Sequence, residues 1–119
     1  MNFTTWVKSY FSYRGKTLSL YRSGMTKANK HDYDGAIADY SAAIRAPNIP
    51  ADVKAMAIYN RALAYSAIHE DEKSAEDLTA VLEMPGLPKN IKREAQERRE
   101  RIRRRDERET DRAAQRTHE

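Results

Sequence analysis

The sequence contains no cysteine. It therefore cannot form a disulfide, and it offers neither a thiolate metal ligand nor a cysteine nucleophile. The absence also suits a reducing compartment, so we expect a cytoplasmic protein. Only four glycines are present and they do not cluster, which excludes a glycine-rich phosphate-binding loop.

Long apolar runs are missing as well. No stretch approaches the roughly 18 residues that a membrane-spanning helix needs. We also expect no secretory signal, because the N-terminus has no leading charge, no long apolar segment and no small-residue cleavage site. With 119 residues, of which 39% are apolar, the chain can form one domain with a modest core.

Charge is distributed unevenly along the chain. Residues 1–30 contain six Lys or Arg and no acid, and residues 31–91 contain five basic and ten acidic residues. Residues 92–119 contain eleven basic and eight acidic residues. Two basic segments therefore flank an acidic middle, and any anionic partner is expected to bind near the ends of the chain.

The strongest pattern is an internal repeat. Residues 31–53 recur, weakly changed, at residues 69–91, with a constant offset of 38 residues. A period between 20 and 50 residues without a gap is typical of solenoids built from one repeated unit. The identical pairs include His31/His69, Asp39/Asp77, Ala42/Ala80, Pro47/Pro85 and Pro50/Pro88.

Apolar spacing within each copy predicts a pair of helices. We expect helices over residues 16–30, from Asp32 to about Arg45, over residues 51–68, and from the Glu70–Glu72 turn to Pro85. Asp32 is a plausible N-cap, and the prolines end the second helix of each pair because they lack an amide donor. A last helix keeps an apolar stripe only as far as Ile102 and should fray beyond it.

The first residues show a separate pattern. Their apolar side chains fall on one face of a short helix, which Gly15 should interrupt. We expect this helix to cover the open end of the repeat stack. An interfacial membrane helix, disorder and a partner-binding peptide are the open alternatives. The residues of this face are Phe3, Trp6, Val7, Tyr10 and Phe11.

These patterns divide the chain into three parts. We predict an N-terminal aromatic helix at residues 1–14, two helical hairpins at residues 15–90, and a capping helix with a charged, Arg-rich tail at residues 91–119.

The two copies resemble the tetratricopeptide repeat. The likeness rests on the twelve-residue step from Gly24 to Ala36, the further four residues to Tyr40, and the equivalent positions of the second copy. The period of 38 residues exceeds the roughly 34 of that family. The residues that carry the resemblance are Leu20, Gly24, Ala36, Tyr40 and Pro47, then Ile58, Ala62, Tyr65, Leu78 and Pro85.

The resemblance implies an all-α fold, a short right-handed α-solenoid of two hairpins. Small residues such as Gly24 and Ala36 should then let two helix backbones approach closely. It also implies that the first helix of each pair lines a concave, peptide-binding face. The residues expected there are Tyr21, Arg22, Met25, Asn29, Tyr59, Asn60 and Leu63.

Asn60 matches a position where such proteins often place an asparagine that bonds the ligand backbone. Of the pattern that clamps a peptide carboxylate in chaperone-binding members, only Asn60 and Arg98 fit, so we do not assign that ligand. Tyr21 and Tyr59 have a second interpretation, in which they pack between helices.

A stripe of arginines follows the last helix. Arg98, Arg101, Arg105 and Arg108 step by three or four residues and suit an anion-binding surface for nucleic acid, an acidic partner or an anionic membrane. The alternative is a solvated helix stabilised by its own charges. That alternative rests on acid-first pairs four residues apart, namely Glu94/Arg98, Glu97/Arg101 and Glu100/Arg104.

No constellation of residues suggests catalysis. His31 and His69 occupy the same turn in two copies and are interpreted as turn residues, and no nucleophile lies at a meaningful spacing from a base. We therefore expect no enzyme activity, metal or cofactor. The predicted function is a protein-interaction module, an adaptor or a self-associating scaffold. The alternative is a nucleic-acid-associated protein, and a membrane partner is not expected.

Overall fold

The structure is a computed structural model that describes the backbone of residues 3–118 and the side chains of residues 15–118. Within that range the chain forms five helices and no strand, which confirms the all-α prediction. The helices are α1 (Phe3–Asn29), α2 (Tyr33–Arg45), α3 (Ala51–Ala67), α4 (Asp71–Leu82) and α5 (Lys89–Thr117).

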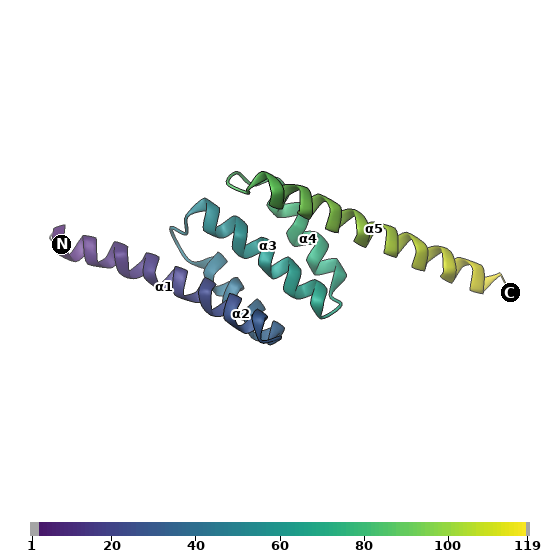
Figure 1. Cartoon of the computed structure of the whole chain (residues 1–119), viewed down its shortest axis with the longest axis horizontal. Coiled ribbons are helices and arrows are strands. Elements are labelled where there is room, and N and C mark those ends of the chain that lie inside the picture. The colour runs from purple at the N-terminus through teal and green to yellow at the C-terminus, as the bar shows by residue number, and fades with distance from the viewer. Residues whose placement is uncertain (1–2, 119) are drawn as a thin grey trace.

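Each helix packs against the next one in the chain, so that α1 with α2 and α3 with α4 form two hairpins and α5 lies on the second. The first, third and fifth helices form one layer, and α2 and α4 lie behind them (Figure 1). The N-terminal part of α1 and the C-terminal part of α5 extend beyond the other helices at opposite ends. The molecule is therefore elongated, with extents of 74 × 27 × 23 Å.

One sequence prediction is wrong at the start of the chain. The helix does not break at Gly15, because α1 runs without interruption from Phe3 to Asn29. A single exposed glycine costs a helix only about 0.5–1 kcal/mol relative to alanine, which a long helix can absorb. The prediction that the aromatic face covers the open end of the stack concerns side chains outside the described residues.

The turns inside the two hairpins share one backbone conformation. His31 and His69 both adopt a left-handed conformation with φ of 63°. In each turn the histidine amide bonds back three residues and the next amide bonds back five, which is the Schellman arrangement of a helix C-terminus. The bonds are His31 N to Ala28 O, Asp32 N to Lys27 O, His69 N to Ser66 O and Glu70 N to Tyr65 O.

The connections that follow each hairpin repeat as well. Asn48 has φ of 62° and Gly86, the residue 38 positions later, has φ of 90°. Pro50 and Pro88 then precede α3 and α5 with nearly identical dihedral angles. The predicted cap of α2 also forms, because an Asp32 carboxylate oxygen accepts a hydrogen bond of 3.0 Å from the Gly35 amide.

The core lies between the second hairpin and α5. Side chains of α2 and of the connections pack on it from outside, Ile44, Met84 and Leu87 among them. The apolar stripe of α5 ends at Ile102, as predicted, and residues 103–118 are exposed. The buried members of this core are Ala55, Ile58, Tyr59, Ala62, Leu78, Val81, Ala95 and Ile102.

An aspartate joins the two helices of each hairpin at equivalent positions. In the first hairpin Asp39 accepts a 2.6 Å hydrogen bond from Ser23 and pairs with Lys27 at 3.0 Å. In the second hairpin Arg61 donates two hydrogen bonds, of 2.8 and 2.7 Å, to the Asp77 carboxylate. The ion pair of the second hairpin is therefore bidentate, the stronger geometry for a guanidinium and a carboxylate.

Candidate functional site

Four of the predicted groove residues come together around one cavity. It has a volume of about 390 Å³ and opens between α1, α2, α3 and α5, and we call it the groove cavity. Met25 is one of its lining residues and has 41% of its surface exposed. The lining residues are Met25, Ala28, Asn29, Tyr33, Tyr40, Asn60, Leu63, Ala64, Ala67 and Arg98.

Asn60 already has a partner within the chain. Its side-chain Nδ2 donates a 2.9 Å hydrogen bond to the Tyr21 hydroxyl, and Tyr21 lies beside Tyr40 with ring centroids 6.0 Å apart. Burial raises the pKa of Tyr21, while the hydrogen bond from Asn60 opposes that rise. The bond orients the Asn60 amide, whose Oδ1 and second N–H are the groups that could meet a ligand backbone.

The structure places Tyr59 in the core, where only 3% of its surface is exposed. The interpretation that it packs between helices is therefore right for Tyr59, and it cannot line a groove. Its hydroxyl makes no hydrogen bond of standard geometry within the described residues. Burial raises the pKa of Tyr59 to about 12, with nearby Glu94 adding to the rise and Arg98 opposing it. Arg22 is exposed and does not line the cavity.

A second cavity contains all four arginines of the predicted anion-binding stripe. It has a volume of about 280 Å³ and lies between α5 and the α3–α4 hairpin, and we call it the arginine cavity. Residues from three helices therefore meet there, although the stripe itself lies on α5 alone. The lining residues are Leu63, Ser66, Ser74, Arg98, Arg101, Ile102, Arg104, Arg105 and Arg108.

Two of the three predicted acid-first pairs form on α5. Arg98 pairs with Glu94 at 3.0 Å and Arg104 pairs with Glu100 at 3.5 Å. Both carboxylates are drawn to lower pKa: that of Glu94 by the nearby Tyr59 hydroxyl and by Arg98, and that of Glu100 by Arg103. The solvated-helix interpretation therefore holds for this part of the stripe.

The remaining arginines of the cavity are less neutralised. The third predicted pair is absent, since no ion pair joins Glu97 to Arg101 in the described part of the chain. Arg105 lies 3.4 Å from Asp71 of α4. The Arg108 side chain bonds only a backbone carbonyl, at 3.4 Å. The cavity therefore keeps an excess of positive charge.

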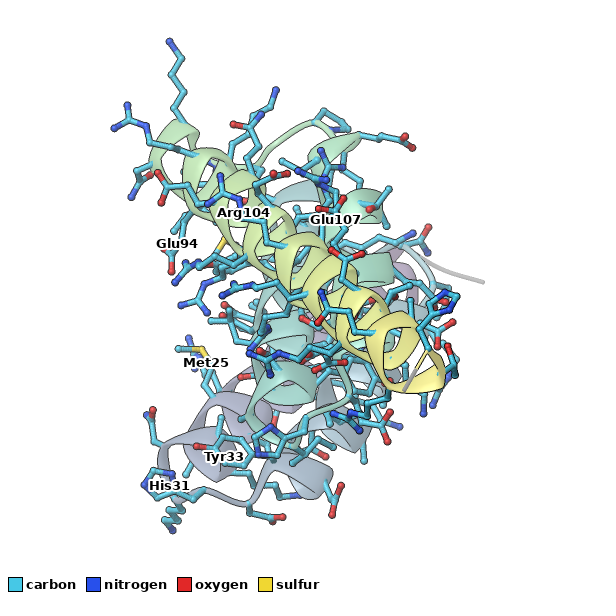
Figure 2. All side chains as sticks on the ribbon, turned by 90° about the vertical axis from the view of Figure 1, so that its right-hand side faces the viewer. Met25, His31, Tyr33, Glu94, Arg104 and Glu107 are labelled. Carbon is cyan, nitrogen blue, oxygen red and sulfur yellow. The ribbon has the colours of Figure 1, made fainter. Side chains whose placement is uncertain are left out.

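Leu63 and Arg98 line both cavities, so the two form adjoining parts of one surface. The side chains of Met25 on α1 and Glu94 on α5 point to the same side of the molecule (Figure 2). The sequence places the groove residues and the arginines in separate groups. Nothing in the spacing shows that they meet at Leu63, because that contact depends on how α5 docks.

Other features provide weaker candidates for a site. A hollow of about 490 Å³ between α1 and α2 contains none of the predicted site residues. His31 and His69 stand in exposed turns, and His31 Nδ1 lies 2.8 Å from the Tyr33 hydroxyl. Among the described residues no group of three or more His, Asp or Glu could hold a metal ion. In the same part of the chain, none of the helices combines the length and the hydropathy needed to cross a bilayer.

Comparison of the chain with protein-family models, with curated proteins and with solved structures finds no match in any of the three. The geometry of the two adjoining cavities is therefore the basis for a functional conclusion.

Proposed function

We propose that this chain is a non-catalytic protein-interaction module, an adaptor or scaffold in the cytoplasm, which binds a segment of a partner protein in the groove cavity. The observation that carries the proposal is the position of Met25 beside Leu63, Asn29 and Asn60 around one open cavity. The wall of this cavity combines apolar side chains with amide and guanidinium groups, and polar groups of this kind fix the orientation of a bound ligand.

We further propose that the fold is a short tetratricopeptide-like solenoid. The repeated left-handed residues His31 and His69, and Asn48 and Gly86, support this arrangement, since each pair is separated by the sequence period of 38. In such an array the first, third and fifth helices form the concave side. The groove cavity takes most of its lining from these three helices, which is the expected position for a bound peptide.

The chemistry of the groove cavity suits an extended chain. Met25 and Leu63 supply apolar contact area, worth about 25 cal/mol per Å² of surface removed from water. The amides of Asn29 and Asn60 can bond the ligand's backbone groups, which would otherwise lose their hydrogen bonds to water on binding. Because Tyr21 orients the Asn60 amide before the ligand arrives, less side-chain entropy is lost on binding.

Selection from a random peptide display library tests the proposal without a known partner. The wild-type protein should enrich binders, and the variant Met25→Glu should not capture them. The matched control is Ala38→Glu, which adds the same charge at an exposed position of α2. If the selected peptides bound all three proteins equally, the groove cavity would not be the binding surface.

The exposed end of α5 favours one alternative, a nucleic-acid-associated protein. The C-terminal part of α5 extends beyond the hairpins (Figure 1). The exposed residues 103–118 contain Arg108, Arg112 and Arg116. Phosphate contacts would lower the affinity steeply with salt, with a slope of roughly −0.9 per contact on duplex DNA. Binding of a duplex oligonucleotide at several salt concentrations, with and without residues 106–119, measures this contribution.

A further inference from the structure

The arginine cavity indicates the chemistry of the partner. We infer that the bound segment carries a short acidic run whose carboxylates occupy the arginine cavity, next to an apolar residue that occupies the groove cavity. This inference rests on the proposed function, since it assigns a partner chemistry to the same surface.

The charge of the cavity is the first argument. Five guanidinium groups line a volume of about 280 Å³, and no carboxylate is among its lining residues. Glu94, Glu100 and Asp71 pair with three of the five from outside the lining. Arg101 and Arg108 form no ion pair within the described residues, although Arg101 is near enough to Glu94 to help lower the pKa of that carboxylate. The mutual repulsion of these guanidinium groups falls when an anion enters the cavity between them.

The continuity of the surface is the second argument. Leu63 of α3 and Arg98 of α5 line both cavities, so a chain that crosses these two side chains passes from the groove cavity to the arginine cavity. Ser66, one helical turn after Leu63, adds a hydroxyl to the arginine cavity. The surface thus changes from apolar and amide groups to guanidinium groups, and the partner should show the matching order.

The dimensions give the length of the acidic run. Arg101 and Arg108 are seven residues apart on one helix, which corresponds to about 10 Å at a rise of 1.5 Å per residue. An extended peptide advances about 3.3 Å per residue, so about three residues cover that distance. Guanidinium groups bind carboxylates with paired, directional hydrogen bonds, which rewards acids held at that spacing.

A peptide suits this surface better than a nucleic acid does. Bases bound as single strands stack on exposed aromatic rings. The groove cavity has two aromatic rings in its lining, Tyr40 and Tyr33. Tyr40 is only 2% exposed, and the Tyr33 hydroxyl lies within hydrogen-bond distance of His31. A neighbouring hollow of α5 is lined by Glu97 and Glu100 as well as by Arg101 and Arg104, so the unbalanced positive charge does not continue there for a longer polyanion.

The test uses the full chain and a labelled peptide of one leucine followed by three glutamates, with a glutamine version for comparison. Fluorescence anisotropy measures binding to the wild type, to Arg101→Gln/Arg108→Gln and to Arg93→Gln/Arg99→Gln. The second pair removes the same charge from exposed positions of α5 outside the cavity. We expect the glutamate peptide to bind more tightly than the glutamine peptide. The cavity pair should lose at least about tenfold in affinity and the control pair less than about twofold.

Three outcomes would overturn the inference. Equal losses in the two arginine pairs would mean that only the overall field attracts the peptide. Equal binding of the glutamate and glutamine peptides would remove the role of charge. Tighter binding of a single-stranded oligonucleotide, lost in the cavity pair, would assign the cavity to nucleic acid. The display selection separates the two proposals, because groove-dependent binders without acidic residues would overturn this inference and leave the proposed function standing.

Discussion

A Cβ atom on Gly24 would lie 2.6 Å from Cε1 of Tyr40, closer than side-chain carbons can approach. The ring of Tyr40 therefore occupies the space that a side chain on α1 would fill. Gly24 and Ala36 are expected to let two helix backbones approach closely, and at Gly24 the atoms that exclude a larger side chain belong to the Tyr40 ring. The second hairpin reaches the same packing with another pair, since Ala62 and Leu78 stand at the positions equivalent to Gly24 and Tyr40.

The first prediction follows from this pair. Gly24→Ala should lower the free energy of unfolding by about 1–3 kcal/mol, because the new methyl group overpacks against the ring. The double variant Gly24→Ala/Tyr40→Leu copies the second hairpin and should be more stable than the sum of the two single changes implies. Urea unfolding of all four proteins measures this coupling. Gly15→Ala is the control and should stabilise α1 slightly, because a Cβ there meets nothing within 4 Å.

The second prediction concerns the buried hydroxyl of Tyr59. Tyr59→Phe keeps the ring and removes a buried hydroxyl that lies near Glu94 without a hydrogen bond of standard geometry, so the free energy of unfolding should rise by about 1 kcal/mol. The control Tyr65→Phe removes a hydroxyl from a half-buried ring that lies near Arg61 and Lys73. Thermal melting of both variants checks the difference. A loss of stability in Tyr59→Phe would mean that the hydroxyl has a partner after all.

The third prediction is a loss of stability in alkali. Burial raises the pKa of Tyr40 and of Tyr59 from 10.0 to about 12 in the folded protein. The folded state therefore favours the neutral phenol, and this contribution is complete below pH 10.0 and is lost as the pH rises through about 12. Urea midpoints measured between these pH values should fall. The fall should be smaller in Tyr59→Phe, which has one fewer such group, and an equal fall would contradict the assignment.

The fourth prediction uses the left-handed turn residue His69, whose φ is 63°. A residue with a Cβ pays about 1–2 kcal/mol for this conformation, whereas glycine adopts it freely. Glycine also gives the unfolded chain more conformational entropy, which offsets part of the strain that is removed. The net effect of His69→Gly should be a rise of a few degrees in the melting temperature. His69→Ala keeps the strain and should give no gain. Equal effects of the two changes would show that the turn is not strained.

The fifth prediction is that, without a bound partner, α5 frays beyond Ile102, where its buried face ends, so that the arginine cavity becomes ordered as far as Arg108 only on binding. Amide hydrogen exchange should show protection across residues 54–82, partial protection to about residue 102 and little after it, since an exposed helix end is marginal in water. Truncation after Arg105 should leave the melting temperature nearly unchanged. Strong protection of residues 106–116 in dilute monomer would contradict this. Protection found only at high protein concentration would identify a dimerisation arm instead.

The sequence by itself determined the secondary structure and the repeat. The cap at Asp32, the ends of α2 and α4 near prolines, and the extent of the buried stripe to Ile102 all follow from residues a few positions apart. These signals are local, so their effect does not depend on the rest of the fold. The error at Gly15 has the same origin, because a glycine weakens a helix locally without deciding whether a long helix continues.

Only the tertiary structure decided which side chains face a partner. Tyr21 and Tyr59 are equivalent in the repeat, yet Tyr21 is half-buried and bonded to Asn60 while Tyr59 is fully buried beneath α5. The spacing on α5 aligns the arginines but does not say whether they face solvent or Leu63. Both outcomes depend on how helices rotate and cross where they bring together residues that are 35 or more positions apart in the sequence. Those angles are set by the summed contacts of the core, and no pattern within a single helix contains them.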